Sequence, residues 1–306
     1  MKNLSVWLTA LRLRTLPLAT ASIIVAAGIA VHHQIFQLPI FLLSLSTALL
    51  LQILSNLAND YGDAITGADD ENRIGPLRAM QTGIITPTAM KKAILFTTLL
   101  TLLSGISLLM VALAGDLFSW LLFLGLGLTA IIAAITYTMG KLPYGYRALG
   151  DIAVFLFFGL LGVVGSFYLY DLSFDWLLLL PASSIGLLSA AVLNINNMRD
   201  LENDRKYNKT TLVVLFGRAH ALKYHLFIIL IAPLLTAYYL YRLPETQTWQ
   251  YIFLLAMSPL LKSCLALHNV INEKQPSGEL FNEQLKNTAI STFVFSMLFA
   301  LVLIPQ

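Results

Sequence analysis

Residues 15–59 read T-L-P-L-A-T-A-S-I-I-V-A-A-G-I-A-V-H-H-Q-I-F-Q-L-P-I-F-L-L-S-L-S-T-A-L-L-L-Q-I-L-S-N-L-A-N, a stretch without Asp, Glu, Lys or Arg. A membrane-spanning helix needs about 20 mostly apolar residues, so this stretch is long enough for two. His32, His33 and Pro39 interrupt it and predict a break between them. Helices are expected because backbone polar groups in lipid must be satisfied within the segment.

The rest of the chain repeats this pattern. Six further stretches lack charged residues: 93–115, 117–140, 152–170, 176–198, 224–241 and 287–306. A seventh apolar segment, 249–268, is interrupted only by Lys262. Charged residues make up 11% of the chain, against about 25% in soluble domains. We therefore expect one domain, residues 1–306, that is an all-α integral membrane protein with nine transmembrane helices in a lipid bilayer.

Basic residues predict the orientation of these helices. With a cytoplasmic N-terminus, 17 of the 19 Lys and Arg residues fall on the cytoplasmic side, and only Lys262 and Arg242 do not. This bias follows the positive-inside rule. It predicts a multi-pass protein of the plasma (inner) membrane, with the C-terminus outside and the polar chemistry facing the cytoplasm. The net charge of +3 therefore does not indicate nucleic-acid binding.

Two acidic segments stand at the inner ends of apolar helices. In the first, Asn56, Asp60 and Asp63 have i, i+4, i+7 spacing, and Asn59 and Asp69 lie beside them. This spacing places the first three on one helix face.

The second segment has the same character. Asn196, Asp200 and Asp204 have i, i+4, i+8 spacing, with Asn197 adjacent. A shift of 140 residues superimposes the first two on Asn56 and Asp60, which predicts two pseudo-equivalent halves around one cavity.

Carboxylates stacked on one helix face repel one another, so a positive partner is expected. Oxygen ligands suit Mg²⁺, which binds one or two carboxylates together with substrate phosphates. Neither segment contains His or Cys ligands, which argues against zinc. The alternative is that these are ordinary solvated helix ends, but two matching faces in a chain with so little charge favour a metal–phosphate site.

Basic and aromatic residues accompany the acids. Arg73 and Arg78 follow the first segment, and Arg199 and Lys209 belong to the second. Such groups bind phosphate oxygens, although the positive-inside rule alone would also place them here. A third inner segment contains four further candidates for the site: Tyr137, Lys141, Tyr144 and Asp151.

Four segments together resemble the UbiA superfamily of intramembrane prenyltransferases: N-D-Y-G-D-A-I-T-G-A-D (59–69), R-I-G-P-L-R-A-M-Q-T-G (73–83), P-Y-G-Y-R-A-L-G-D (143–151) and N-N-M-R-D-L-E-N-D-R-K-Y-N-K-T-T-L (196–212). R-L-R-T-L-P (12–17) extends the resemblance to nearly the whole chain. Within the superfamily, they are most similar to the branch that prenylates 1,4-dihydroxy-2-naphthoate in menaquinone biosynthesis.

The resemblance implies a central cavity and two Asp-rich motifs that hold Mg²⁺ and a polyprenyl diphosphate. It assigns Asp60, Asp63, Asp200 and Asp204 to the motifs, and Lys141 to a YxxxK element that begins at Tyr137. Many members have Asp where this chain has Gly67, so Asp69 is a further candidate ligand.

The implied reaction is Mg²⁺-dependent transfer of the polyprenyl group to the naphthoate ring, with loss of diphosphate and CO₂. The expected catalytic residues are the four motif carboxylates and Lys141, and Arg78 and Lys209 add positive charge. Two alternatives remain: another aromatic acceptor, such as 4-hydroxybenzoate, and a transporter. A transporter is expected to have broken helices near the bilayer midplane rather than acids at inner helix ends.

Overall fold

The computed structural model describes residues 2–67, 78–244, 246–271 and 278–305, and these residues are almost entirely helical. Within these described residues, eight helices are long and apolar enough to cross a membrane, and the bent pair Leu4–Leu11 and Leu16–His32 gives a ninth if it is counted as one span. The prediction of an all-α multi-pass membrane protein is therefore confirmed.

The helices follow the predicted apolar stretches. Their bounds are α1 Lys2–Leu11, α2 Leu16–His32, α3 Leu38–Thr66, α4 Pro87–Ala112, α5 Leu117–Thr136, α6 Gly150–Val154, the π-helical segment η3 Phe155–Gly165, α7 Ser166–Asp171, α8 Leu179–Lys206, α9 Leu212–Arg242, α10 Met257–Ile271 and α11 Gly278–Val302. Short 3₁₀ segments are η1 Leu13–Thr15, η2 Tyr144–Tyr146, η4 Trp176–Leu178 and η5 Thr248–Ala256. The α6–η3–α7 run forms one span, Gly150–Asp171.

Local sequence explains where the helices begin. Proline occupies the first turn of α2, α3 and α4, where its missing N–H needs no partner. The Thr86 hydroxyl accepts a hydrogen bond from the Ala89 N–H at 3.2 Å and caps α4. Thr211 caps α9 in the same way, through the Val214 N–H at 3.2 Å. These caps fix the ends of the two helices that follow the acidic segments.

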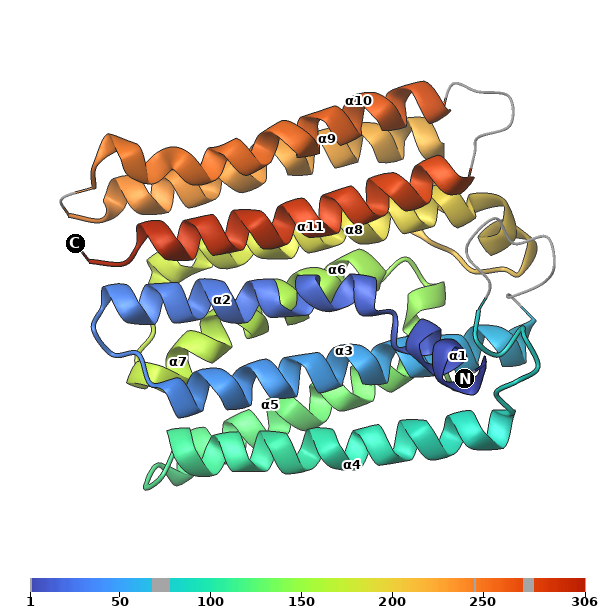
Figure 1. The fold of residues 1–306 in the computed structure, drawn as a ribbon, viewed down its shortest axis with the longest axis horizontal. Coiled ribbons are helices and arrows are strands. Elements are labelled where there is room, and N and C mark those ends of the chain that lie inside the picture. The colour runs from blue at the N-terminus through green and yellow to red at the C-terminus, as the bar shows by residue number, and fades with distance from the viewer. Residues whose placement is uncertain (1, 68–77, 245, 272–277, 306) are drawn as a thin grey trace.

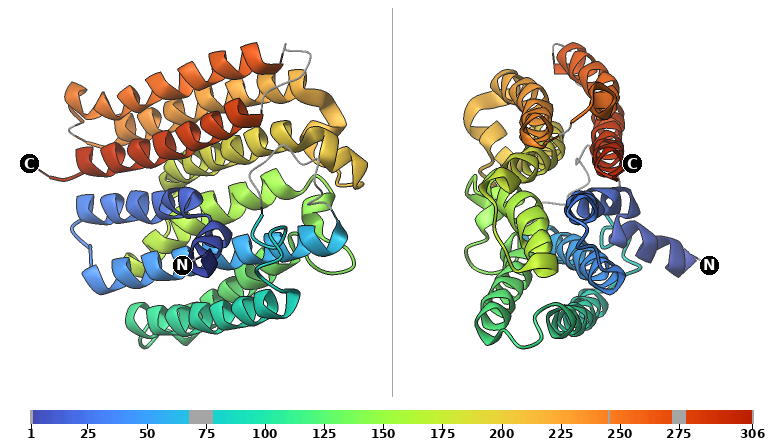
Figure 2. Two further views of the ribbon diagram at one scale, coloured as in Figure 1. Left: turned by 45° about the vertical axis from the view of Figure 1, so that its right-hand side comes forward. Right: turned by 90° about the vertical axis from the view of Figure 1, so that its left-hand side faces the viewer.

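The spans run along one direction and form a closed bundle (Figures 1 and 2). α3 packs against α2, α4 and α5, and α8 packs against α9, α11 and η3. α2 also contacts α11, which brings the first and last spans together. The N-terminal helix α1 and the C-terminus lie toward opposite ends of the bundle (Figure 1). The bundle thus holds α3 and α8, the two acidic helices, on either side of its interior.

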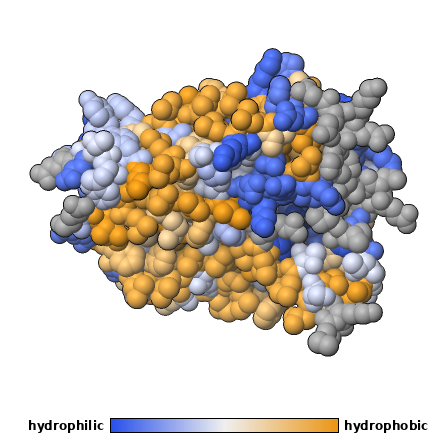
Figure 3. All heavy atoms as spheres, turned by 45° about the horizontal axis from the view of Figure 1, so that its top comes forward, coloured by the Kyte–Doolittle hydropathy of each residue, from blue (hydrophilic) through white to orange (hydrophobic). Residues whose placement is uncertain are grey.

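The outer surface is suited to lipid. Exposed large apolar side chains line α4 and α5, among them Leu103, Met110 and Phe118. On the face drawn in Figure 3, hydrophobic residues cover most of the middle, and the most hydrophilic residues gather toward the right-hand end. Because exposure of so large an apolar surface to water is unfavourable, this distribution agrees with a bilayer environment.

Glycines allow η3 and α8 to approach closely. A Cβ on Gly159 would lie 2.6 Å from the Ala182 carbonyl oxygen, and one on Gly186 would lie 2.9 Å from the Phe155 carbonyl oxygen. Either side chain would force the two backbones apart, so the contact depends on the absence of both. The wide π-helical turn of η3 therefore lies directly against the helix that carries Asp200 and Asp204.

The connection between α8 and α9 is short. Most of the polar region 199–220 is helical, because α8 continues to Lys206 and α9 begins at Leu212. Two acids of this region are paired with basic residues: Arg199 contacts Asp200, and Lys209 contacts Asp204. The prediction of two pseudo-equivalent halves is not tested by these contacts and stays a prediction.

Candidate active site

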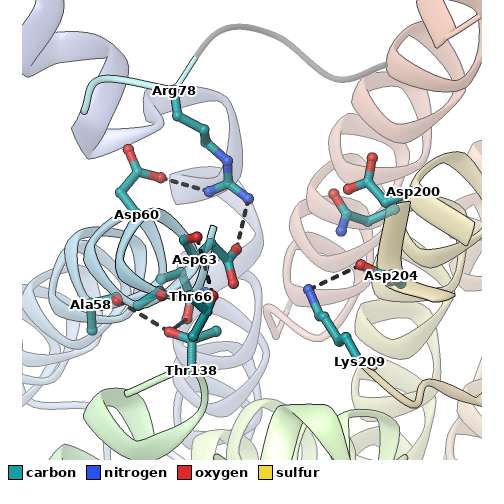
Figure 4. Close-up of polar contacts among 12 residues, drawn as sticks. Ala58, Asp60, Asp63, Thr66, Arg78, Thr138, Asp200, Asp204 and Lys209 are labelled. Carbon is teal, nitrogen blue, oxygen red and sulfur yellow. Dashed lines mark hydrogen bonds and ion pairs between the residues drawn. The ribbon is translucent and has the colours of Figure 1, made fainter. Parts of the chain in front are cut away.

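The first acidic face lies at the inner end of α3 and is paired with arginine. Asp60 and Asp63 are 1% and 4% exposed. The Arg78 guanidinium lies 2.6 Å from Asp60 Oδ1 and 3.2 Å from Asp63 Oδ2, so one side chain joins the two carboxylates (Figure 4). Arg12, from the turn after α1, adds a second contact to Asp60 Oδ1 at 2.5 Å. The i, i+3 spacing of the acids makes this bridge possible.

The second acidic face lies at the inner end of α8. Arg199 donates from Nε and Nη2 to the two oxygens of Asp200, at 2.7 and 2.6 Å. Arg199 also donates to Asn196 Oδ1 on the same helix at 2.8 Å and to Asn282 Oδ1 of α11 at 2.7 Å. The second of these bonds ties α8 to α11. Asp204 is one turn further along and 3% exposed. Figure 4 shows Asp200 and Asp204 across from Asp60 and Asp63.

Lys209 lies between the two faces. It follows α8 in the loop 207–211, and its Nζ is 3.4 Å from Asp204 Oδ1. Burial alone would lower the pKa of Lys209, but Asp63 and Asp204 outweigh it and raise that pKa well above its usual value. Lys209 is therefore a permanent cation that faces carboxylates from both α3 and α8.

A cavity of about 390 Å³ opens beside these charges. From the first half, its polar lining contains Asn56, Asn59, Asp63 and Arg78. From the later segments, the predicted residues that line it are Tyr137, Tyr144, Asn196, Asn197 and Lys209. The rest of the wall is mostly aliphatic and aromatic, from α2, α3, α4, α5 and η3. The cavity thus joins a charged end to an apolar interior, the arrangement needed for a ligand with an anionic head and an apolar chain.

The asparagines of α3 also organise the site. Asn56 donates to the Leu11 carbonyl at 2.9 Å and to the Thr15 hydroxyl at 3.2 Å, which ties α3 to the N-terminal turn. Asn59 accepts from the Thr138 hydroxyl at 3.2 Å, and Thr138 also donates to the Ala58 carbonyl at 3.1 Å. Both asparagines therefore combine a position on the cavity wall with a structural contact.

Two tyrosines form part of the cavity wall. The rings of Tyr137 and Tyr144 meet edge to face, 5.3 Å apart, and the Tyr144 hydroxyl donates to the Ala133 carbonyl at 3.0 Å. Burial raises the pKa of Tyr144 to about 12, and burial followed by the charge of Asp151 raises the pKa of Tyr137. Both hydroxyls therefore stay protonated at neutral pH.

Six predicted site residues in the described part of the chain are absent from the cavity wall. Four of them, Asp60, Arg199, Asp200 and Asp204, are paired in the acidic faces beside the cavity, and the other two are Lys141 and Asp151. Lys141 is exposed and absent from the wall, because α5 ends at Thr136 and the chain turns at Gly140, where φ is +101°. The four-residue spacing from Tyr137 to Lys141 is therefore not helical. The catalytic role expected for Lys141 is not tested by this placement and stays a prediction.

Asp151 is the second of these residues that is neither on the cavity wall nor in an acidic face. It is 6% exposed and lies at the start of α6, where its partner is Tyr224 of α9, and it does not line the cavity. Its contact with α9 shows that one side of this carboxyl faces another span, and its expected role in binding stays a prediction. Asp69 and Arg73, two other predicted site residues, fall outside the described residues.

Two residues of the site were not predicted from the sequence. Arg12 lines the cavity and contacts Asp60. Tyr146 donates from its hydroxyl to Asp63 Oδ1 at 3.0 Å. Burial, followed by the Asp63 charge, raises the pKa of Tyr146 to about 12, so this hydroxyl remains a donor. Both residues lie in segments that carry the family resemblance, but spacing cannot reveal a contact between residues so distant in sequence.

The donor set suits a hard divalent cation. The four motif carboxylates offer only oxygen ligands, and Asp204 Oδ2 is buried without a hydrogen-bond partner among the described residues. Within the same residues, no three His, Cys, Asp or Glu side chains are grouped closely enough to hold one metal ion. Arginine and lysine contact the carboxylates instead, so a bound cation would have to replace some of these contacts.

Comparisons with known proteins identify relatives of the whole chain. A family model described as the UbiA prenyltransferase family matches residues 19–282. The 1,4-dihydroxy-2-naphthoate octaprenyltransferase of Escherichia coli is 46% identical over 96% of this chain and 94% of its own length. The protein of the same name from Haemophilus influenzae is 44% identical over 87% of each chain.

Solved structures support the same fold. A UbiA homologue from Archaeoglobus fulgidus bound to GPP and Mg²⁺ superimposes with a TM-score of 0.61 at 16% identity, over 96% of this chain and 99% of its own. The structure of this homologue bound to DMAPP and Mg²⁺ gives a TM-score of 0.60 at 18% identity, over 96% and 98%. With the family match and the close relatives, these findings show that the chain belongs to the UbiA prenyltransferase family.

Proposed function

We propose that this protein transfers a polyprenyl group from polyprenyl diphosphate to 1,4-dihydroxy-2-naphthoate, with loss of diphosphate and CO₂, to give demethylmenaquinol, the hydroquinone form of demethylmenaquinone. The observation that carries the proposal is the pair of acidic helix ends that face each other at the charged end of an apolar cavity (Figure 4). The choice of acceptor rests on the relatives at 46% and 44% identity, which are named for this reaction.

The four motif carboxylates, Asp60, Asp63, Asp200 and Asp204, are proposed to hold Mg²⁺ together with the diphosphate. The bound ion supplies positive charge that stabilises the departing diphosphate. Arg78 already bridges Asp60 and Asp63, and it lines the cavity, so it can turn one N–H toward a diphosphate oxygen. Asp69 is proposed as an additional ligand.

Lys209 is the second protein cation proposed to contact the diphosphate. It lies at the cavity wall between the two acidic faces and stays protonated. Positive charge fixed where negative charge develops stabilises the transition state without reorganisation of the site. Asn59, Asn196 and Asn197 line the same end and can donate hydrogen bonds to the head group.

The apolar part of the cavity has two tasks in this proposal. It receives the prenyl chain, and it keeps water from the allylic cation that forms when the carbon–oxygen bond breaks. The ring carbon that bears the carboxylate attacks this cation, and loss of CO₂ restores the aromatic ring. Tyr137 and Tyr144 present aromatic surface at the boundary between the charged and apolar ends, where the acceptor ring has to lie.

We also propose that the protein resides in the inner membrane with its active site facing the cytoplasm. The basic residues concentrate at the inner helix ends, as the positive-inside rule requires. The acidic ends of α3 and α8 are on the same side as α1, and the C-terminus is toward the opposite end (Figure 1). This arrangement supports the proposed orientation, with the N-terminus in the cytoplasm and the C-terminus outside.

Product analysis with purified protein tests the proposal. The protein is incubated with Mg²⁺, a polyprenyl diphosphate and either 1,4-dihydroxy-2-naphthoate or 4-hydroxybenzoate, and products are identified by mass spectrometry. The expected result is a decarboxylated prenyl product from the naphthoate alone. A prenylated 4-hydroxybenzoate would reassign the acceptor, and no product from either acceptor would overturn the proposed function.

A further inference from the structure

Tyr146 contacts Asp63 of the first acidic face and Lys209, which pairs with Asp204 of the second. Its hydroxyl donates to Asp63 Oδ1 at 3.0 Å and also contacts the Thr66 hydroxyl at 3.1 Å, both on α3. Its ring lies under Lys209, whose Nζ is 5.5 Å from the ring centroid. A cation at this distance from an aromatic face is attracted by the ring. One side chain therefore contacts a carboxylate of the first motif and the lysine that pairs with the second.

Backbone hydrogen bonds fix Tyr146 relative to the loop 207–211. The Thr210 N–H donates to the Tyr146 carbonyl at 3.1 Å, and the Ala148 N–H donates to the Thr210 carbonyl at 2.8 Å. These bonds form an isolated parallel β-bridge between Arg147 and Thr210. Ala148 adopts a left-handed conformation, with φ of +56°, which few non-glycine residues tolerate without support from their surroundings.

Asp63 is held at both of its oxygens. Tyr146 contacts Oδ1, and Arg78 contacts Oδ2 at 3.2 Å. If Arg78 turns toward a ligand, the Tyr146 hydroxyl is the contact that still fixes the orientation of the carboxylate. Tyr146 itself is half-buried and does not line the cavity, so its side-chain contacts in this structure are with Asp63, Thr66 and Lys209.

We infer that Tyr146 is a positioning residue that joins the two acidic motifs: its hydroxyl orients Asp63 for Mg²⁺, and its ring seats Lys209 for the diphosphate. The inference deepens the proposed function and rests on it. It assigns a separate task to each part of the side chain, so two substitutions can distinguish them.

Tyr146→Phe tests the hydroxyl. Binding is measured as the rise in thermal unfolding midpoint of the purified protein when Mg²⁺ is titrated in the presence of inorganic pyrophosphate. A hydrogen bond to a charged group contributes enough to raise the half-saturating Mg²⁺ concentration by about 10- to 100-fold. At saturating Mg²⁺, kcat should stay within about threefold of the unmodified protein, because the reacting groups are unchanged.

Tyr168→Phe is the matched control, since it also removes one tyrosine hydroxyl from a side-chain hydrogen bond, here with the Ser119 hydroxyl at 2.9 Å. Tyr168 lies on α7, outside the cavity wall. Its loss should lower the unfolding midpoint at most, without a change in the Mg²⁺ concentration for half-saturation. An equal response of Tyr146→Phe and Tyr168→Phe would overturn the role of the hydroxyl.

Tyr146→Leu tests the ring. This substitution removes the surface under Lys209 as well as the hydroxyl, so KM for the prenyl diphosphate should rise about tenfold above that of Tyr146→Phe. Equal KM values for the two variants would overturn the role of the ring. A combined Asp63→Asn and Tyr146→Phe protein should bind Mg²⁺ and pyrophosphate no more weakly than Asp63→Asn alone, and additive losses would contradict action through Asp63.

The unmodified protein separates the two possible failures. If Mg²⁺ and pyrophosphate do not stabilise it, the metal–diphosphate site itself is wrong, and the inference falls with it. If they stabilise it and the Tyr146 variants behave as the control does, the proposed function stands and only the role of Tyr146 is refuted.

Discussion

Replacement of Arg78 by methionine should separate its structural role from its role toward the substrate. The guanidinium contacts Asp60 at 2.6 Å and Asp63 at 3.2 Å, and its side chain is 10% exposed. Loss of one partner of a buried ion pair costs about 3–5 kcal/mol, because the charge left behind is buried without compensation. Arg12 still contacts Asp60 in the variant, so we expect a value near the lower limit, about 3 kcal/mol.

This loss should depend on the metal. In the presence of Mg²⁺ and pyrophosphate, the cation supplies the charge that Arg78 supplied, so the difference in unfolding midpoint from the unmodified protein should become smaller. Turnover should remain low even at saturating Mg²⁺. Removal of one fixed donor to a developing anion typically lowers kcat by about 10²–10³-fold.

The assay is prenyl transfer by purified Arg78→Met protein across a Mg²⁺ titration, together with thermal unfolding under the same conditions. Arg78→Lys is the control variant, since it keeps the charge but cannot bridge two carboxylates, and it should show an intermediate kcat. A kcat of Arg78→Met within about threefold of the unmodified value would refute the contact with diphosphate, because the 10²–10³-fold effect of a lost donor would be missing.

Three further substitutions address other parts of the site. Asp204→Asn should lower kcat by at least about 10³-fold, because an amide is a weaker ligand than a carboxylate for a hard cation. The amount of the variant in the membrane should be unchanged, and prenyl transfer by isolated membranes measures the loss of kcat. Lys141→Ala should retain at least about half of the prenyl-transfer activity, because the side chain is exposed and outside the cavity wall. A large loss of activity would instead support a catalytic role for Lys141. Gly62→Ala should lower stability by about 1–3 kcal/mol, because the added Cβ would lie 2.7 Å from the Thr138 carbonyl oxygen; an unchanged unfolding midpoint would contradict this.

The sequence predicts the membrane fold well because the dominant constraint is local. Charge-free stretches of about 20 residues in lipid can only be helical, so spans such as Leu117–Thr136 follow directly from composition. The acidic faces were predictable for a similar reason, since i, i+4 spacing on α3 and α8 needs no knowledge of the rest of the fold. All four motif carboxylates are indeed buried on those two helices.

The partners of these carboxylates were not predictable, because they depend on contacts between distant segments. Arg12 reaches Asp60 across 48 positions and Tyr146 reaches Asp63 across 83. Lys141 lies outside the cavity wall for a local reason, because the turn at Gly140 ends the helical spacing that begins at Tyr137.

The position of a bound metal tests the central claim most directly. Crystals grown with Mn²⁺ and inorganic pyrophosphate, measured at the manganese absorption edge, should show anomalous density between the α3 pair, Asp60 and Asp63, and the α8 pair, Asp200 and Asp204. The pyrophosphate should contact Arg78 or Lys209 in the same crystals. Manganese bound to one helix alone, or elsewhere in the protein, would contradict a site shared by both motifs.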